Sequence, residues 1–195
     1  MNKLEKEVKL CKYLLDKYAP IINEHEKRTI GEIKSLVDGT DLSIQSLVSD
    51  FKDASYSFED DYFAALKQVF EFIQKEIEFV DIDLSVNYWF SPREIIEAKV
   101  ADDEDLAVFL CASLKALGDN KAELIIAELD DLKTHAFVIT EINKDFLILD
   151  PAQEFEIEKY KGQKSEVLKN YSFQGQKIKR FLYRFNSEKY EQFLE

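Results

Sequence analysis

Apolar residues in the first part of the chain recur every three or four positions, which is the period of helices that bury one face. Three short segments show this period, and they are residues 3–18, residues 30–37 and residues 47–51. Pro20 ends or kinks the first of them, because proline lacks the N–H that continues a helix. We therefore predict that residues 1–56 form a helical extension packed on the rest of the chain.

Two helices in the middle of the chain carry strong start signals. Ser57 opens a capping-box pattern in front of a long apolar stripe. Further on, Ser91, Pro92 and Glu94 supply an N-cap, a proline at the first helical position and an acid at the third. These signals predict one long buried helix and one short helix, the second preceded by an extended segment at residues 85–90.

A third central helix begins in an acidic run at residues 102–105 and closes at Gly118, an arrangement that suits the helix dipole and a left-handed cap. Three β-branched or aromatic runs follow it, separated by polar turns. They are residues 124–129, 135–140 and 146–150. Helices followed by an antiparallel sheet predict the α+β class.

The C-terminal part adds one more strand signal, an alternation of apolar and polar residues at 181–185. We divide the chain into the helical extension 1–56, a core at 57–152 and an extension at 153–195 that completes the sheet. With Gly 5 and Pro 3 the chain has few hinge positions, so these parts are expected to form one compact unit.

Charge and cysteine content narrow the function classes. Lys+Arg 26 against Asp+Glu 39 gives a net charge of −13, which repels nucleic-acid phosphates and anionic membranes. Cys11 and Cys111 are too few and too far apart for a disulfide framework or a zinc motif. No signal peptide or membrane span is present in the sequence, so we expect a cytoplasmic protein without nucleic-acid or membrane partners.

The acidic helix start, the motif THAFVI and the motif FLILDPA follow the order and spacing of the transglutaminase-like superfamily. The resemblance covers residues 63–152 and implies a papain-like core, with a central helix packed on an antiparallel sheet and a Cys-His-Asp triad. His135 matches the family histidine, and Asp150 matches the family aspartate. Counting back 15 positions from Gly118, which matches the glycine at the helix end, places the nucleophile at residue 103, where this chain has Asp103.

Aspartate at this position argues against acyl transfer. A cysteine thiolate at a helix start beside histidine attacks amide carbonyls near neutral pH, whereas a carboxylate is a poor amide nucleophile. Cys111 lies eight residues along the same helix, roughly 12 Å from its start at 1.5 Å per residue, and is expected to be a core thiol. Cys11 reaches the site only if the N-terminal helix folds across it.

Three interpretations of Asp103, His135 and Asp150 remain open. In the first, the trio is a structural remnant, with Asp103 capping its helix and His135 bonded to Asp150. In the second, the carboxylates and the imidazole bind a divalent ion, with Glu104 as a further ligand. In the third, His135 is a general base that activates water.

We favour an inactive transglutaminase-like domain that binds a protein or peptide in the former substrate cleft. The alternative is an amide or ester hydrolase that uses water or a metal at the same three residues. Trp89, Glu104 and Asp105 are the further residues that we assign to binding, and for Trp89 plain core packing is the competing interpretation. We expect no cofactor and no bound metal.

Overall fold

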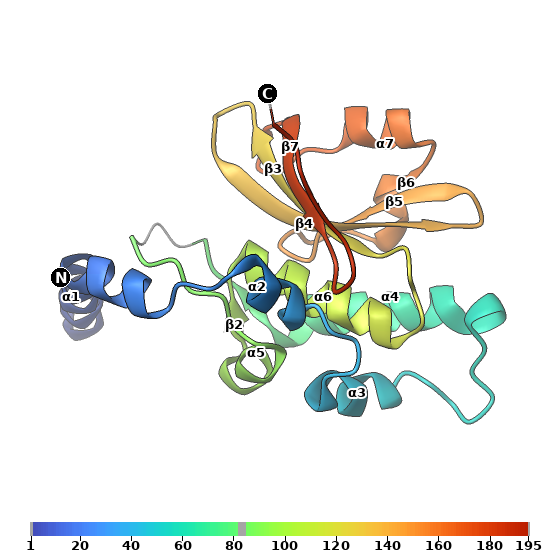
Figure 1. The fold of residues 1–195 in the computed structure, drawn as a ribbon, viewed down its shortest axis with the longest axis horizontal. Helices are drawn as coiled ribbons and strands as arrows, with labels where there is room; N and C mark the ends of the chain where they lie inside the picture. Colours follow the sequence, from blue (N-terminus) through green and yellow to red (C-terminus); the bar gives the residue numbers. More distant parts are fainter. Residues whose placement is uncertain (1, 82–84, 195) are drawn as a thin grey trace.

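The computed structural model describes residues 2–81 and 85–194, which form three layers (Figure 1). A six-stranded antiparallel sheet lies between a layer of helices that includes α4 and α6 on one face and the short helix α7 on the other. This mixture of helices and antiparallel sheet confirms the predicted α+β class.

The sheet has the strand order β6-β5-β4-β3-β7-β8. Its strands are β3 (Glu123–Leu129), β4 (Thr134–Ile142), β5 (Asp145–Leu149), β6 (Lys161–Gly162), β7 (Ile178–Phe185) and β8 (Tyr190–Gln192). The three runs after Gly118 are thus confirmed as strands, and the alternation at 181–185 lies within β7. The domain boundaries at 56 and 152 remain predictions.

Helix α6 (Asp103–Ala116) lies at the centre of the molecule. Most of its residues are buried, because it packs on β3 and β4 with one side and on neighbouring helices with the others. Cys111 is fully buried and has its pKa raised by desolvation, as expected for a core thiol. The buried helix fixes where its N-terminus, and therefore Asp103, meets the sheet.

The other helices are α2 (Ile30–Leu36), α3 (Leu42–Ser49), α4 (Phe58–Glu76), α5 (Pro92–Ala98), a 3₁₀ turn η1 (Ile157–Tyr160) and α7 (Lys164–Asn170). The capping box at Ser91 is complete, as predicted. At Ser57 the pattern is only half realised, because the backbone N–H of Ser57 donates to Asp61 and not to Asp60. Residues 85–90 contain no strand; the chain instead forms a short parallel pair, β1 (Glu78–Phe79) with β2 (Val100–Ala101).

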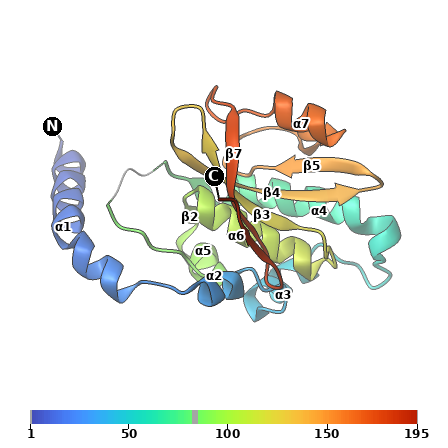
Figure 2. The same ribbon diagram turned by 45° about the horizontal axis from the view of Figure 1, so that its top comes forward.

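Helix α1 (Lys3–His25) departs from the expected helical layer. It continues through Pro20, so the predicted end at residue 18 is too early. Ala19 is its only buried residue among those described, and the helix extends away from the sheet and from α6 (Figure 2). Helices α2 and α3, in contrast, contact α6 directly.

The strand register determines on which face of the sheet His135 and Asp150 lie. Val138 pairs with Leu149, and one further step along the hairpin places Asp150 opposite Phe137. His135 is therefore the diagonal neighbour of Asp150 on the same face, within reach of a side-chain contact. This face is the one covered by α7, where Phe137, Ile148 and Tyr171 form a second apolar cluster.

The turn between α2 and α3 depends on Gly39. A Cβ at this position would lie 2.6 Å from the backbone nitrogen of Ala116 at the end of α6. We predict that Gly39→Ala destabilises the protein by about 1–3 kcal/mol in urea unfolding, because backbone atoms must move apart. Gly31→Ala is the matched control: its Cβ meets nothing closer than 3.8 Å within a helix, so it should leave stability unchanged or slightly raised.

Candidate functional site

His135, the second residue of strand β4, lies between two carboxylates. Its Nε2 is 3.0 Å from Oδ2 of Asp150, and its Nδ1 is 2.8 Å from Oδ2 of Asp103. The first contact is a hydrogen bond, whereas the second is a close ion contact in which the N–H is not aligned with the oxygen. The structure thus brings together the three residues that the sequence singled out.

Asp150 is fully buried and accepts several hydrogen bonds. The hydroxyl of Tyr171 donates to its Oδ2 at 2.7 Å, and Nε2 of Gln153 donates to the same oxygen at 2.6 Å. The N–H of Ala152 donates to Oδ1 at 3.1 Å. Sequence reasoning missed Gln153 and Tyr171; Gln153 has a local signal, three residues after the aspartate, but Tyr171 is 21 positions away and has none.

Asp103 does not cap its helix, contrary to the first interpretation above. Asp102 is the N-cap, with its Oδ1 accepting from the N–H of Asp105 at 3.0 Å, and Asp103 is the first helical residue. The carboxylate of Asp103 instead accepts from the N–H of Ala136 at 2.7 Å and contacts His135. It connects the start of α6 to strand β4.

The imidazole is almost closed off from solvent. His135 is 1% exposed, and the ring of Phe173 stacks on it with centroids 3.6 Å apart and planes at 12°. The side chain of Asp103 remains 19% exposed and lines a small cavity beside Phe173. Access to the trio is therefore through Asp103.

The charges of the trio support one another. Burial by itself would lower the pKa of His135, but the close contact with Asp103, the hydrogen bond to Asp150 and the charges of both groups outweigh it and raise the pKa to about 9. Burial raises the pKa of Asp103, and the contact with His135 overcomes this and lowers it. At neutral pH the site is an imidazolium between two carboxylates.

Two adjoining cavities open at the start of α6, and Glu104 lines both of them. The first, about 530 Å³, is mainly apolar, and we call it the apolar cavity; its lining includes Ile33, Trp89, Ile126, Tyr183, Phe185 and Tyr190. The second, about 610 Å³, is the acidic cavity; its lining includes Asp81, Asp102, Asp103, Glu104 and Lys133. They share the wall residues Asn87, Trp89, Glu104 and Thr134, so together they form one groove past the trio.

Trp89 and Glu104, two of the residues assigned to binding, lie in this shared wall. Trp89 also packs toward Phe185, with ring centroids 6.4 Å apart, so it combines core packing with a position in the groove. Burial, followed by the charges of Asp103 and Asp102, raises the pKa of Glu104 to about 8. Glu104 therefore carries a proton at neutral pH and can donate a hydrogen bond.

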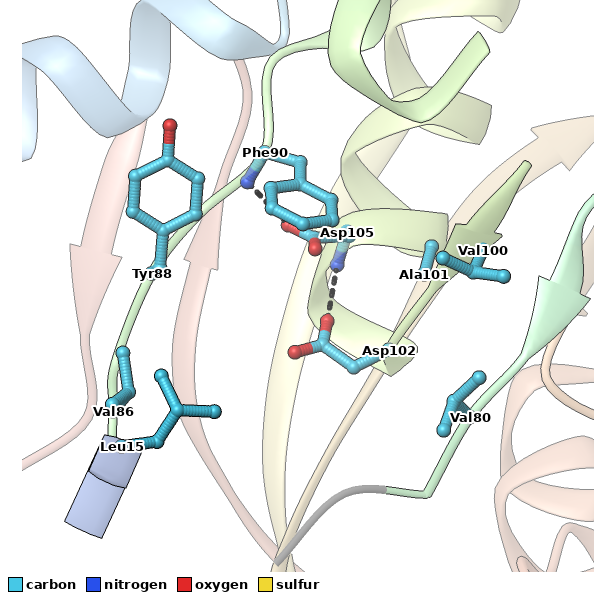
Figure 3. A pocket seen from close by; sticks show the side chains of 9 residues that line it. All are labelled: Leu15, Val80, Val86, Tyr88, Phe90, Val100, Ala101, Asp102 and Asp105. Carbon is cyan, nitrogen blue, oxygen red and sulfur yellow. Dashed lines mark hydrogen bonds between the residues drawn. The ribbon is translucent and has the colours of Figure 1, made fainter. Parts of the chain in front are cut away.

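Asp105, the third assigned residue, faces a different cavity. Its Oδ1 accepts from the N–H of Phe90 at 2.7 Å, which ties residues 85–90 to the start of α6 (Figure 3). The surrounding pocket of about 280 Å³ is walled by Leu15, Val80, Tyr88 and Val100. Burial and the neighbouring Asp102 raise the pKa of Asp105 to about 8. Asp105 lies apart from the groove.

Among the described residues, the acidic start of α6 is the one group whose composition suits a metal ion. One carboxylate oxygen from each of Asp102, Asp103 and Glu104 lies within 4.8 Å of the others. His135 has both ring nitrogens next to carboxylates, so it has no nitrogen available as a ligand. The predicted ligand set with His135 is not the set that the structure assembles.

The comparisons with known proteins agree with this geometry. A family model described as a transglutaminase-like domain matches residues 42–178. LapG of Legionella pneumophila is 18% identical over 85% of this chain and 88% of its own, with a TM-score of 0.54. The EGTA-treated form of LapG is 20% identical over 85% of this chain and 86% of its own, with a TM-score of 0.53. These similarities to LapG establish a shared fold.

No curated protein matches the sequence. Within the described residues, no helix is both long and apolar enough to cross a membrane.

Placing a thiol at residue 103 tests the geometry. In Asp103→Cys, we expect the imidazolium of His135 to favour the thiolate, so that iodoacetamide alkylates residue 103 roughly tenfold faster than exposed Cys11 at pH 7. Mass spectrometry of timed samples measures both rates, and buried Cys111 serves as an unreactive reference. Adding His135→Gln should remove the difference. Alkylation of residue 103 no faster than that of Cys11 would mean that the trio is not arranged as described.

The pH dependence of stability follows from His135. Its pKa is about 9 in the folded protein and 6.5 as the usual value, so folding is favoured by proton binding between these two values. This contribution is fully present below about pH 6.5 and is lost as the pH rises through 9. The raised pKa values of Glu104 and Asp105 act in the same direction, because their ionisation costs more in the folded state.

We therefore predict that the free energy of unfolding in urea falls between pH 6.5 and pH 9. NMR of the imidazole carbons should show His135 still protonated at pH 7.5, with exposed His25 as the second signal. A His135 signal that titrates below pH 7 would contradict the ion contacts with both carboxylates.

Proposed function

We propose that this chain, which belongs to the transglutaminase-like domain family, is a non-catalytic member that binds an extended peptide in its groove. The observation that carries the proposal is the pairing of His135 with two carboxylates, where catalysis would need a thiol beside a free base. The groove beside these residues is open, whereas His135 is paired on both sides and does not serve as a base.

Several features argue against the hydrolase alternative. A general base needs an unprotonated nitrogen facing water, but both nitrogens of His135 face carboxylates and the pKa of about 9 keeps the ring charged at neutral pH. Phe173 covers the ring face. Asp103 is held by His135 and Ala136, so its carboxylate is committed to structure.

The lining of the groove indicates the chemistry of the peptide. Trp89, Tyr183 and Phe185 offer aromatic surface for an aliphatic or aromatic side chain. The acidic cavity next to it carries Asp81 and Asp103, with Lys133 as its basic residue, and so favours a basic or hydrogen-bond-donating group. A peptide with an apolar residue followed by a basic residue would place the first in the apolar cavity and the second in the acidic cavity.

A selection from a random peptide library displayed on phage tests this proposal. We expect enriched sequences to combine an apolar and a basic residue, and we expect Trp89→Ala to weaken the selected peptide roughly tenfold or more, as for a central interface aromatic. Calorimetry of the selected synthetic peptide measures the affinities, and thermal unfolding checks that Trp89→Ala still folds.

Glu104→Gln supplies a variant of nearly unchanged shape. It keeps a hydrogen-bond donor but loses the carboxylate, so binding of a basic peptide should weaken at pH 9, where Glu104 is ionised, more than at pH 6. The matched control is Glu59→Gln, also an acid in the first turn of a helix, on α4 and outside the groove. Selected peptides whose affinity changes in neither Trp89→Ala nor Glu104→Gln would refute the proposal. Amide hydrolysis by the wild type that disappears in His135→Ala would refute it as well.

A further inference from the structure

Helix α1 exposes an unusual amount of apolar side chain. Leu4 is 67% exposed, Val8 is 58% exposed and Tyr18 is 45% exposed. Leu10, Tyr13, Leu14 and Ile21 on the same helix are exposed as well. Isolated helices of this length are marginally stable in water, and helices in proteins owe most of their stability to packing of an apolar face. The exposed face of α1 therefore lacks the contacts that a stable helix needs.

The rest of the chain covers only one edge of this helix. Asn23 is bonded to residues 85–87, with its Nδ2 donating to the carbonyl of Ser85 at 2.9 Å and its Oδ1 accepting from the N–H of Asn87 at 2.8 Å. Ala19 is buried and Leu15 lines the small pocket of Figure 3. The half of α1 before Leu15 extends clear of the sheet and its helices (Figure 2).

The apolar residues of α1 follow the spacing of a coiled coil. Leu4, Val8, Cys11, Leu15, Tyr18 and Ile22 are separated by steps of four and three in strict alternation. This period of 3.5 residues is the one that lets two helices keep their apolar seams in contact. Val8, Leu15 and Ile22 occupy the a positions. Val8 and Ile22 are β-branched, which favours two-stranded parallel pairs at this position.

The charges of α1 fit a second copy of the same helix. In a parallel pair, Glu7 at position g lies opposite Lys12 at position e of the other helix, so each pair forms two complementary contacts. Helix α1 contains five lysines and four acidic residues and is nearly neutral, whereas the whole chain carries −13. Glu7 also contacts Lys3 of its own helix, with Nζ and Oε1 3.7 Å apart, so the contact with Lys12 of the second copy adds to an existing pair. An apolar seam on a nearly neutral helix suits self-pairing better than binding to a strongly charged surface.

We propose that α1 is the dimerisation element of this protein and that residues 4–18 pair in parallel and in register with the same residues of a second copy. Leu4, Val8, Cys11 and Tyr18 are the exposed seam residues, and Leu15, which is only partly covered by its own chain, borders both the seam and the small pocket. None of the proposed seam residues lines the two cavities of the groove. Cys11 then faces Cys11 of the second copy at a d position.

Cross-linking tests the register. Cys11 is exposed and Cys111 is buried, so a short bis-maleimide reaches only Cys11 in the folded chain. We expect a covalent dimer on a denaturing gel, abolished by Cys11→Ser. A chain that is dimeric in solution but gives no cross-link would overturn the parallel register.

Light scattering across the micromolar range tests the pairing itself. The wild type should be a dimer, and Val8→Lys should raise its dissociation constant roughly tenfold or more, because two lysines then meet in the seam. Leu42→Lys is the control: Leu42 is 84% exposed at the start of α3, so the dimer should persist. Val8 is exposed, so unchanged thermal unfolding of the core shows that Val8→Lys folds.

A wild-type chain that stays monomeric throughout this range, or a dimer unaffected by Val8→Lys, would overturn the proposal. So would binding of α1 to neutral lipid vesicles by a monomer, which would identify a membrane surface as the occupant of the apolar face.

Discussion

The contact of one imidazolium with two carboxylates organises this molecule. His135 belongs to strand β4, Asp103 to the start of α6 and Asp150 to the end of β5, so a single ring connects three elements. A buried carboxylate or imidazolium alone would be costly, and removal of one partner leaves the others unpaired. The trio thus constrains how the central helix meets the sheet, and Tyr171 extends it to the segment after α7.

The same contact determines the charge state of the site. A thiol at residue 103 would alternate between thiol and thiolate, whereas the contact with His135 lowers the pKa of Asp103, and Asp103 in turn helps to raise the pKa of His135. The apolar cavity beside the trio is built from other residues, Trp89 and the aromatic residues of β7, so its shape does not depend on the trio.

Two surfaces of the chain therefore have different chemistry. The groove combines aromatic walls with an acidic end, while α1 offers a nearly neutral apolar seam. Residues 85–90 contribute to both: Trp89 lines the groove, Phe90 lines the small pocket beside Leu15 of α1, and Tyr88 lines both the small pocket and the acidic cavity. The N–H of Phe90, bonded to Asp105, fixes this segment to α6.

Local patterns in the sequence predicted most of the helices and the central strands, because strand and helix periods are properties of neighbouring residues. The trio was identified by resemblance to the transglutaminase-like superfamily: His135 and Asp150 matched its motifs, and counting back from the matched Gly118 placed Asp103 at the start of the helix. The partners of the trio depended on the tertiary structure. Phe173 and Tyr171 reach His135 and Asp150 from the segment after α7, Asp102 takes the N-cap that Asp103 was expected to occupy, and Asp105 lies outside the groove. These outcomes depend on how distant segments pack, which no local spacing encodes. The exposure of α1 is of the same kind, since its apolar period predicted a helix but could not say whether the chain itself or a second copy covers it.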